Sequence, residues 1–325
     1  MKRIQIVLAA VAALLCLGAA DARAQSWPSK PVKIIAPFAA GGAADTLGRI
    51  IADHLSTAFK QQFYVENRGG AGGLIGAQAA VAADPDGYTL VVSSIASNVI
   101  SPAFHANAGY DGLRDFTHIA YLGGPPVVMI VHPSLGVKTY KEFLAVARAN
   151  KEPMSFISPG TGSHAFLIGE YLARQENFKI SHIPYKGAGP ALTDLVAGHV
   201  KLGFMTFSSA AAQVRAGKVL ALAITSEKRI PSLPDVPTFR ELGQDLVAAT
   251  WFSLSGPAKL PNDIVQQISR ETLKAMQLPE VQKRLEMDAI ETRLFSPEEF
   301  TKFIEAETAR WAPLAKEIAA SQKKK

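Results

Sequence analysis

The apolar and polar positions along the chain follow two different periods. Short runs rich in β-branched residues, such as residues 32–35, are typical of buried strands. Other stretches repeat their apolar residues at helical spacing, as Leu47, Ile51 and Leu55 do. Because the two patterns alternate along most of the chain, the sequence predicts an α/β architecture with mainly parallel sheets. The predicted strands are 31–36, 63–66, 88–93, 127–131, 154–158, 180–184, 202–207, 219–225 and 248–255, and the predicted helices lie around 47–58, up to residue 82, at 139–149, from residue 163, and at 190–197, 262–276, 279–286 and 297–320.

The first 24 residues have the features of an export signal. The start is basic, residues 7–20 are almost wholly apolar, and Ala22-Arg23-Ala24 is a small-x-small cleavage site. The apolar run is shorter than the roughly 20 residues that a membrane span needs. We therefore expect a cleaved signal over residues 1–24, a mature chain that begins at Gln25, and a location in the periplasm.

Composition narrows the chemistry that the chain can perform. Its 325 residues are enough for two domains, and its single cysteine, Cys16, lies within the expected signal. The seven histidines have no metal-ligand spacing, and the nucleophile-elbow, zinc-protease and phosphate-loop motifs are absent. A formal charge of +6 without a basic, aromatic stripe favours small anionic partners over nucleic acid. We expect no catalytic residue, no metal site and no cofactor.

Three segments share one local pattern, in which a strand is followed by glycines and then by the start of a helix. They are residues 36–45, 158–164 and 183–194. Backbone N–H groups at a helix start point the same way and form a partly positive site that suits a carboxylate. In α/β folds, ligands bind at the carboxyl ends of the strands. We therefore expect the three segments to line one binding cleft.

Each of these segments also has a plainer interpretation. Gly41 and Gly42 can simply fit a tight turn, and Asp45 can simply cap the helix that follows. The segment Gly160-x-Gly162-x-x-Ala165 fits a loose dinucleotide-binding pattern, which requires an acidic residue at the end of the next strand. The chain has Pro184-Tyr185-Lys186 there, so a nicotinamide cofactor is not expected. The tyrosine and lysine of that tripeptide also fit ordinary core and surface positions.

Six longer motifs occur in order along the mature chain. They are Trp27-Pro-x-Lys-Pro31, Pro37-Phe-x-x-Gly-Gly-x-x-Asp45, Glu66-Asn-Arg-x-Gly-Ala-Gly-Gly-x-Ile-Gly76, Pro85-Asp-Gly-Tyr-Thr89, Pro184-Tyr-Lys-Gly-x-Gly-Pro-Ala-x-Thr-Asp194 and Gly217-Lys-Val-x-Ala-Leu-Ala223. With these motifs, nearly all of the mature chain resembles the solute receptors of tripartite tricarboxylate transporters, also called Bug proteins, of the bacterial periplasm.

This resemblance implies a class II periplasmic-binding-protein fold. In that fold two α/β domains are joined by a two-crossover hinge and have a ligand cleft between them. The resemblance assigns residues 25–125 and 247–325 to one domain and residues 126–246 to the other. It also implies that the chain crosses near Pro125, returns near Val247, and packs its C-terminal helices on the first domain.

The resemblance further implies how a ligand is held. In the family, the loops that correspond to residues 37–45 and 158–164 close on a carboxylate, largely through backbone groups and bridging water. The position of Ser94 carries a hydroxyl in the cleft, and that of Asp45 helps to hold the first loop. The implied partners are a small organic carboxylate and the membrane subunits of a transporter, with the receptor a monomer. The residues expected at the ligand are Phe38, Ala39, Gly41, Gly42, Asp45, Ser94, Asn98, Gly160, Thr161, Ser163, His164, Tyr185, Met205 and Thr206.

The chain departs from the family pattern at the far end of the expected ligand. Relatives often have a histidine where this chain has Phe166, and acidic residues where it has Lys201 and Met205. A buried ammonium group needs a paired acceptor. We therefore predict a ligand whose distal half is neutral and partly apolar and carries no ammonium group. If Lys201 faces the cleft, a dicarboxylic acid becomes possible.

Two other functions remain open from the sequence. A periplasmic receptor that signals to a membrane kinase would share every residue of the cleft with a transport receptor. A periplasmic hydrolase would need an activated nucleophile, which the motifs do not provide. The sequence thus favours a transport receptor without a catalytic step.

Overall fold

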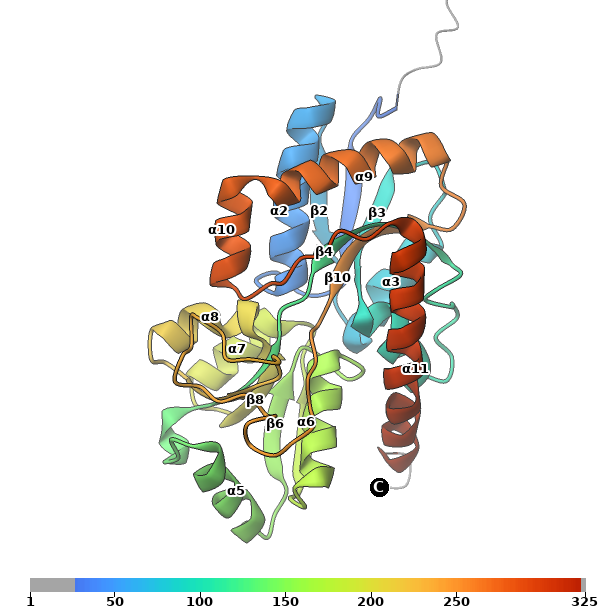
Figure 1. Cartoon of the computed structure of the whole chain (residues 1–325). Coiled ribbons are helices and arrows are strands. Elements are labelled where there is room, and N and C mark those ends of the chain that lie inside the picture. The colour runs from blue at the N-terminus through green and yellow to red at the C-terminus, as the bar shows by residue number, and fades with distance from the viewer. Residues whose placement is uncertain (1–26, 323–325) are drawn as a thin grey trace, which may run out of the picture.

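The computed structural model describes residues 27–322, with Pro297 described in its backbone only, so the expected signal and its cleavage site lie outside the described residues. Two lobes, each built around one sheet, lie end to end (Figure 1). The strands are β1 Val32–Ala36, β2 Phe63–Asn67, β3 Thr89–Ser94, β4 Phe116–Gly123, β5 Val127–Val131, β6 Met154–Ser158, β7 Ile180–Pro184, β8 Leu202–Thr206, β9 Leu220–Ile224 and β10 Phe252–Pro257. The helices are α2 Ala43–Phe59, α3 Leu74–Val81, α4 Ser101–Phe104, α5 Tyr140–Ala149, α6 His164–Gln175, α7 Ala188–Val196, α8 Phe207–Arg215, α9 Asn262–Gln277, α10 Pro279–Met287 and α11 Pro297–Gln322, with short helical turns η1 Ala71–Gly73, η2 Ala96–Ile100 and η3 Pro133–Leu135.

The first domain is built on a five-stranded sheet with the order β2-β1-β3-β10-β4. Strand β1 pairs in parallel with β2 and β3, whereas β10 runs antiparallel to β3 and β4. Helix α2 forms because its apolar residues recur on one face, and Leu47, Ile51 and Leu55 are fully buried against this sheet.

The second domain repeats this plan with the strand order β7-β6-β8-β5-β9. Strand β6 is parallel to β7 and β8, and β5 is antiparallel to β8 and β9. The α/β class and the two-domain architecture predicted from the sequence are therefore confirmed. The expectation of mainly parallel sheets is right for β1–β3 and β6–β8 and wrong for β5 and β10, the two strands that follow the crossovers.

Two chain segments connect the sheets. The first leads from β4 to β5 through residues 124–126, and the second leads from β9 back to β10. They run side by side, since the amide of Thr250 donates a hydrogen bond to the carbonyl of Pro125 at 2.8 Å, and Pro126 pairs with Ala249. Strand β10 begins at Phe252, four residues after the start predicted from the sequence, because residues 248–251 form this connection rather than sheet.

The C-terminal helices only partly follow the expectation that they pack on the first domain. Helix α9 lies against α2 and β4 of that domain. Helix α11 contacts β4, α4 and η2 and continues onto α6 of the second domain, as Figure 1 shows. There Arg174 on α6 forms an ion pair with Glu317 at 2.8 Å. The C-terminal helix therefore bridges the two domains.

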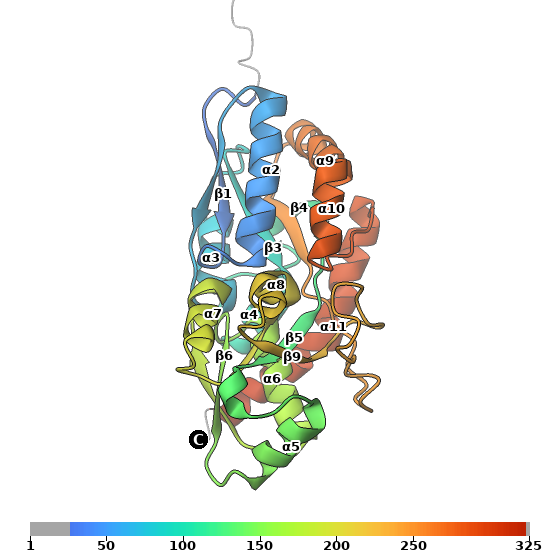
Figure 2. The same cartoon turned by 90° about the vertical axis from the view of Figure 1, so that its left-hand side faces the viewer.

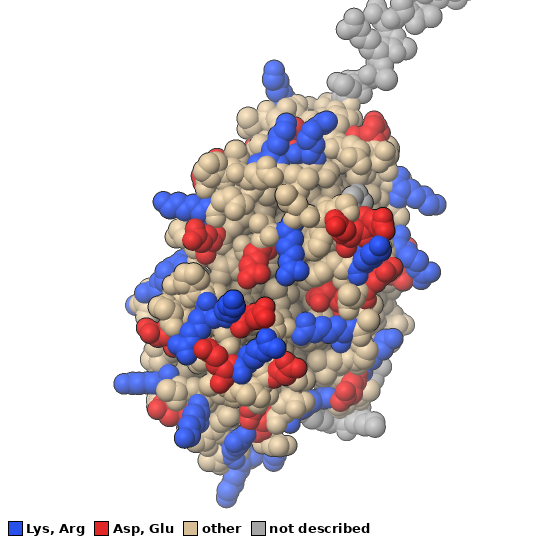
Figure 3. All heavy atoms as spheres, in the orientation of Figure 1, with Lys and Arg blue, Asp and Glu red and all other residues tan. Residues whose placement is uncertain are grey.

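Figure 2, turned by a quarter, shows that α2 and α9 lie beside each other on one side of the first sheet, with α7 and α8 below them at the junction of the lobes. On the face seen in Figure 3, basic and acidic side chains are interspersed over both lobes and form no large patch of one sign. No helix within residues 27–322 is long and apolar enough to cross a bilayer.

Candidate ligand-binding site

A small cavity lies between the two domains, at the carboxyl ends of β1, β3, β6 and β8. Its volume is about 40 Å³. Both domains contribute to its walls, so the cavity is completed only when the domains lie together. The residues that line it are Phe38, Gly42, Ala43, Ala44, Ser94, Ala96, Pro159, Ser163, His164, Ala165, Ala188, Thr206, Ser209, Thr250 and Phe252.

Helix starts converge on this cavity. Helices α2, α6 and α7 begin at the lining residues Ala43, His164 and Ala188. Helix α8 begins immediately after the lining residue Thr206. The N-terminal N–H groups of a helix lack partners within the helix, and the aligned peptide dipoles make that end partly positive. The lining residues include hydroxyl groups, apolar groups and one imidazole but no carboxylate, ammonium or guanidinium. The walls thus offer positive potential from the backbone alone.

Asp45 holds the first glycine loop in place. Its carboxylate accepts hydrogen bonds from the amide of Gly41 at 3.1 Å and from the side chain of Asn67 at 3.0 Å, and it forms an ion pair with Arg49 at 2.9 Å. Burial alone would raise the pKa of Asp45, but these partners outweigh burial and hold that pKa below its usual range. The carboxylate therefore stays ionised and fixes the turn that leads into α2.

The second loop is shaped by Ser163 and the glycine before it. The Oγ of Ser163 accepts a hydrogen bond from the amide of Phe166 at 3.2 Å and so caps α6. Gly162 has a φ of +83°, a conformation that side-chain-bearing residues rarely adopt. The side chain of Ser101, in the first domain, donates to the carbonyl of Gly162 at 3.3 Å.

His164 is the only titratable side chain among the residues lining the cavity. It is 1% exposed, its ring meets that of Trp311 edge-on at 4.8 Å, and its Nδ1 lies 3.0 Å from the Oγ1 of Thr250. Burial, with a smaller contribution from Arg310, lowers the pKa of His164 to about 3. The imidazole is therefore neutral at physiological pH.

Hydrogen bonds from backbone amides of the first domain join the two domains at the first loop and the start of α2. The amide of Ala39 donates to the carbonyl of Lys186 at 2.8 Å, and the amide of Ala43 donates to the Oγ of Ser209 at 3.2 Å. In each pair the donor belongs to the first domain and the acceptor to the second. The structure therefore represents a closed arrangement of the domains.

Glycines permit this close approach. A Cβ atom added at Gly189 would lie 2.4 Å from the carbonyl oxygen of Ala40 in the opposite domain, and one added at Gly72 would lie 2.5 Å from the carbonyl carbon of Gly162. Real Cβ atoms essentially never approach so closely. The glycine-rich motifs thus serve contact between domains as well as local turns.

The predicted site residues fall into three groups. Ala39 and Gly41 belong to the first loop, and Gly160 and Thr161 belong to the second loop, without lining the cavity. Asp45 acts through the first loop, as described above. Those that line the cavity are Phe38, Gly42, Ser94, Ser163, His164 and Thr206.

Three predicted residues lie away from the cavity. Asn98 is buried and donates to the carbonyl of Gly112 at 2.9 Å. The hydroxyl of Tyr185 donates a hydrogen bond to Asp194, and burial, with a smaller contribution from this bond, raises the pKa of Tyr185 to about 12. Met205 is fully buried in the apolar core of the second domain.

Phe166 and Lys201 also entered the prediction about the distal half of the ligand. In the structure both have other roles. Phe166 is fully buried in the core, with its ring 5.4 Å from that of Phe104 and 4.7 Å from that of His182. Lys201 is exposed just before the start of β8, whereas the cavity lies beyond the end of that strand. Lys201 therefore does not provide a cation for a second carboxylate.

Nine lining residues were not among the predicted site residues. Four of them lie within the three predicted segments, namely Ala43, Ala44, Pro159 and Ala188, and the others are Ala96, Ala165, Ser209, Thr250 and Phe252. Thr250 and Phe252 are two positions apart in a segment that was predicted as a strand, so alternation would have placed them on one face. Ser209 lies in the first turn of α8, which has no glycine motif before it. Within residues 27–322, no group of histidine, aspartate and glutamate side chains is arranged to hold a metal ion.

Comparison with known proteins identifies the family. Residues 47–320 match the model of the tripartite tricarboxylate transporter family receptor. A protein of the tcbD-tcbE intergenic region of Pseudomonas sp. (strain P51) is 34% identical over 313 residues, which cover 95% of this chain and 92% of that protein.

Two solved structures have the same architecture. The Rpa4515 protein of R. palustris, solved with adipate, has a TM-score of 0.85 and 30% identity, covering 89% of this chain and 97% of that one. MatC from Rhodopseudomonas palustris, solved with bound malate, has a TM-score of 0.84 and 29% identity, covering 89% of this chain and all of that one, 100%. The family match covers most of the chain, and the two mixed sheets and the cavity at the helix starts agree with it. The protein therefore belongs to the tripartite tricarboxylate transporter receptor family of periplasmic solute-binding proteins.

Proposed function

We propose that this protein captures a small organic carboxylate between its two domains and delivers it to the membrane subunits of a tripartite transporter. The observation that carries the proposal is the convergence of four helix starts on a cavity whose lining residues bear no charged side chain. Such a site attracts an anion without a counter-charge from a side chain. The family membership favours this function over a signalling receptor or a hydrolase, since the family is one of transport receptors.

The ligands of two structural neighbours support a carboxylate as the class of ligand. Rpa4515 was solved with adipate and MatC with malate, and both compounds are carboxylates. In this chain, a bound carboxylate would be held by backbone N–H groups of the two glycine loops and by the hydroxyl of Ser94, Ser163 or Thr206. Charge-assisted hydrogen bonds contribute about 1.5–3 kcal/mol each, so three or four of them, less the cost of immobilising the ligand, give roughly micromolar affinity.

The walls also favour a particular distal half of the ligand. Phe38 and Phe252 provide apolar surface, and no acidic side chain lines the cavity to pair with an ammonium group. We therefore propose that the part of the ligand beyond the carboxylate is partly apolar and carries no ammonium group. The support for this comes from Phe38 and Phe252 rather than from Met205 and Phe166, on which the sequence-based prediction rested.

We further propose that the exported protein is a monomer without a catalytic step, with domain boundaries at residues 125/126 and 246/247. The chain changes sheet between β4 and β5 and again between β9 and β10, which supports those boundaries. The periplasmic location rests on the family and on the signal that the sequence predicts.

A thermal-shift panel tests the ligand class. The panel sets adipate, malate and an aromatic monocarboxylate against aspartate, glutamate and the amide of the monocarboxylate. Stabilisation by one or more carboxylates, with no response to the matched amide, is the expected result. Largest stabilisation by an amino acid would contradict the proposed distal chemistry, and no response to any carboxylate would contradict the ligand class.

A substitution at Gly42 tests the place of binding. A side chain there would point across the gap, with its Cβ 3.7 Å from that of Ala188 and 3.9 Å from the Oγ of Ser209. Gly42→Val should abolish binding because its branches occupy the space between the domains, whereas Gly42→Ala, whose methyl group fits at ordinary contact distance, should bind more nearly normally. Normal calorimetric binding by Gly42→Val would place the ligand elsewhere.

A further inference from the structure

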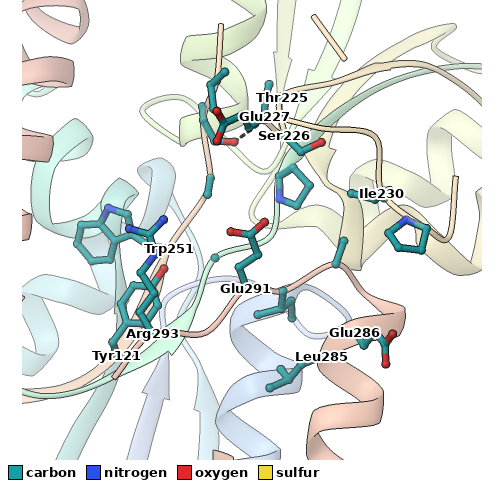
Figure 4. A pocket seen from close by; sticks show the side chains of 18 of the residues that line it. Tyr121, Thr225, Ser226, Glu227, Ile230, Trp251, Leu285, Glu286, Glu291 and Arg293 are labelled. Carbon is teal, nitrogen blue, oxygen red and sulfur yellow. Dashed lines mark hydrogen bonds between the residues drawn. The ribbon is translucent and has the colours of Figure 1, made fainter. Parts of the chain in front are cut away.

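A groove of about 850 Å³ lies apart from the ligand cavity (Figure 4). The two spaces lie on opposite faces of the segment that returns to the first domain. Thr250 and Phe252 line the ligand cavity, whereas Ala249 and Trp251 line the groove. Successive side chains of an extended chain point to opposite sides, so this one segment forms the wall between them. We call the larger space the hinge groove.

Both domains contribute walls to the hinge groove. On the side of the second domain lie Ser226 and Ile230, which follow β9. On the side of the first domain lie Lys283 on α10 and Glu291 beyond it. Figure 4 shows Ser226 and Ile230 across the space from Glu291. The connecting segments themselves, including Pro126, lie between these walls.

We propose that the hinge groove is a conformational lever, so that a group that fills it holds the ligand cavity closed. Two rigid domains that rotate about connecting segments move apart on one side of those segments and approach on the other side. Because the cavity and the groove lie on opposite sides, opening of the cavity brings the groove walls together. In the closed arrangement seen here the cavity measures about 40 Å³ and the groove about 850 Å³.

The charges on the walls of the groove do not favour an occupant of one sign of charge. Lys283 and Arg293 face a space that is also lined by Glu286 and Glu291, so charges of both signs are present. Occupancy by bulk is therefore the property that matters. A tryptophan side chain introduced from either wall would provide that bulk without any added ligand.

Ser226 and Lys283 are suitable positions because they lie on opposite walls and little is lost on replacing them. The Oγ of Ser226 is buried without a hydrogen-bond partner, and Lys283 is exposed on α10. The test variants are Ser226→Trp and Lys283→Trp. Lys141→Trp on α5, an exposed lysine that does not line the groove, is the matched control.

Small-angle scattering of ligand-free protein reports closure directly. Both groove variants should have a smaller radius of gyration than ligand-free wild type, and Lys141→Trp should match the wild type. This readout does not depend on the ligand class, so its failure is distinct from failure of the proposed function. An unchanged or larger radius of gyration in both folded groove variants would overturn the proposal.

Calorimetry with adipate provides a second readout if the wild type binds it. If filling the groove raises the closed fraction of free protein from about 1% to about 10%, the apparent affinity rises about tenfold. The control variant should bind as the wild type does. Weaker binding of adipate by both groove variants would show that the coupling has the opposite sign and would overturn the proposal.

Discussion

The Nδ1 atom of His164 lies 3.0 Å from the Oγ1 atom of Thr250, and this contact joins α6 of the second domain to the segment that returns to the first. Both residues also line the ligand cavity. The pair therefore ties the wall of the site to the connection about which the domains move.

Replacing Thr250 with valine should destabilise the protein. The change keeps the shape of the side chain but leaves the buried Nδ1 of His164 without its partner, and an unsatisfied buried polar group costs about 1–3 kcal/mol. Urea denaturation should show this loss, and Thr250→Ser, which retains the hydroxyl, should recover most of it. Equal stability of Thr250→Val and wild type would mean that the hydrogen bond contributes nothing.

Stability should fall as the pH drops below about 6.5. Burial lowers the pKa of His164 to about 3 and the pKa values of His118 and His182 to about 4, while unfolded histidines keep a pKa near 6.5. Between those values the unfolded chain binds more protons than the native one, so the stability present above pH 6.5 is lost on acidification.

Urea midpoints measured between pH 7.5 and pH 5 test this relation. Each such histidine lowers the free energy of unfolding by about 1.4 kcal/mol per pH unit once the pH lies well below 6.5. Most carboxylates contribute at lower pH than this range. Burial raises the pKa of Glu307, which therefore acts in the opposite direction and can only reduce the measured fall. His182→Gln should have a shallower profile than wild type, and a flat wild-type profile would contradict the burial of neutral histidines.

Replacing Gly189 with alanine should weaken ligand binding without weakening the fold. The new methyl group would lie 2.4 Å from the carbonyl oxygen of Ala40, a contact made only when the domains are closed. Within α7, alanine is favoured over glycine by up to about 1 kcal/mol, so the unfolding midpoint should stay or rise. Calorimetry and urea denaturation of the same variant separate the two effects. Undiminished affinity would mean that closure in solution does not bring these residues together.

Asp45 and Arg49 should differ in importance although they form one ion pair. The side chain of Asp45 is almost wholly buried and also accepts a hydrogen bond from the amide of Gly41, whereas the side chain of Arg49 is 53% exposed. Asp45→Ala should cost about 1–3 kcal/mol of stability and loosen the first loop, because it removes the charged acceptor of the hydrogen bonds from Gly41 and Asn67. Arg49→Ala should cost less than about 1 kcal/mol. Similar losses in urea denaturation would show that the ion pair, not the loop, is what Asp45 supports.

The exported protein should begin at Gln25. The small-x-small site that ends at Ala24 and the short apolar run before it are the reasons. The intact mass of protein recovered from the periplasm checks this directly. A mass that includes residues 1–24, or a lipid on Cys16, would contradict it.

Local signals made much of the site predictable. Gly41 and Gly162 adopt positive φ values, +85° and +83°, so the turns before α2 and α6 need glycine and were visible in the sequence. The family resemblance implied that Asp45 helps to hold the first loop, and in the structure its carboxylate accepts a hydrogen bond from the amide of Gly41 in that loop. The plainer interpretation of Asp45 as a helix cap is wrong, because Gly42 is the N-cap of α2. The two turns and this hydrogen bond depend on a few neighbouring residues.

Features set by long-range contact were not predictable. Met205 and Thr206 are neighbours, and only the register of β8 within its sheet decides that the threonine faces the cavity and the methionine faces the core. Strand β4 was not predicted at all, since it mixes polar with apolar residues. The path of α11 onto the second domain depends on pairs such as Arg174 and Glu317, which are 143 positions apart.

The position of β10 has a consequence for when the first domain can fold. This strand lies between β3 and β4, yet it comes more than a hundred residues after them in the chain. Until residues 252–257 have been synthesised, the sheet of the first domain lacks an interior strand, and two strand edges remain without partners. A nascent chain in that state cannot complete its native core before most of its length exists. The strand order thus makes the native sheet of the first domain one of the last parts of the molecule that can form, because it depends on a strand encoded near the end of the chain.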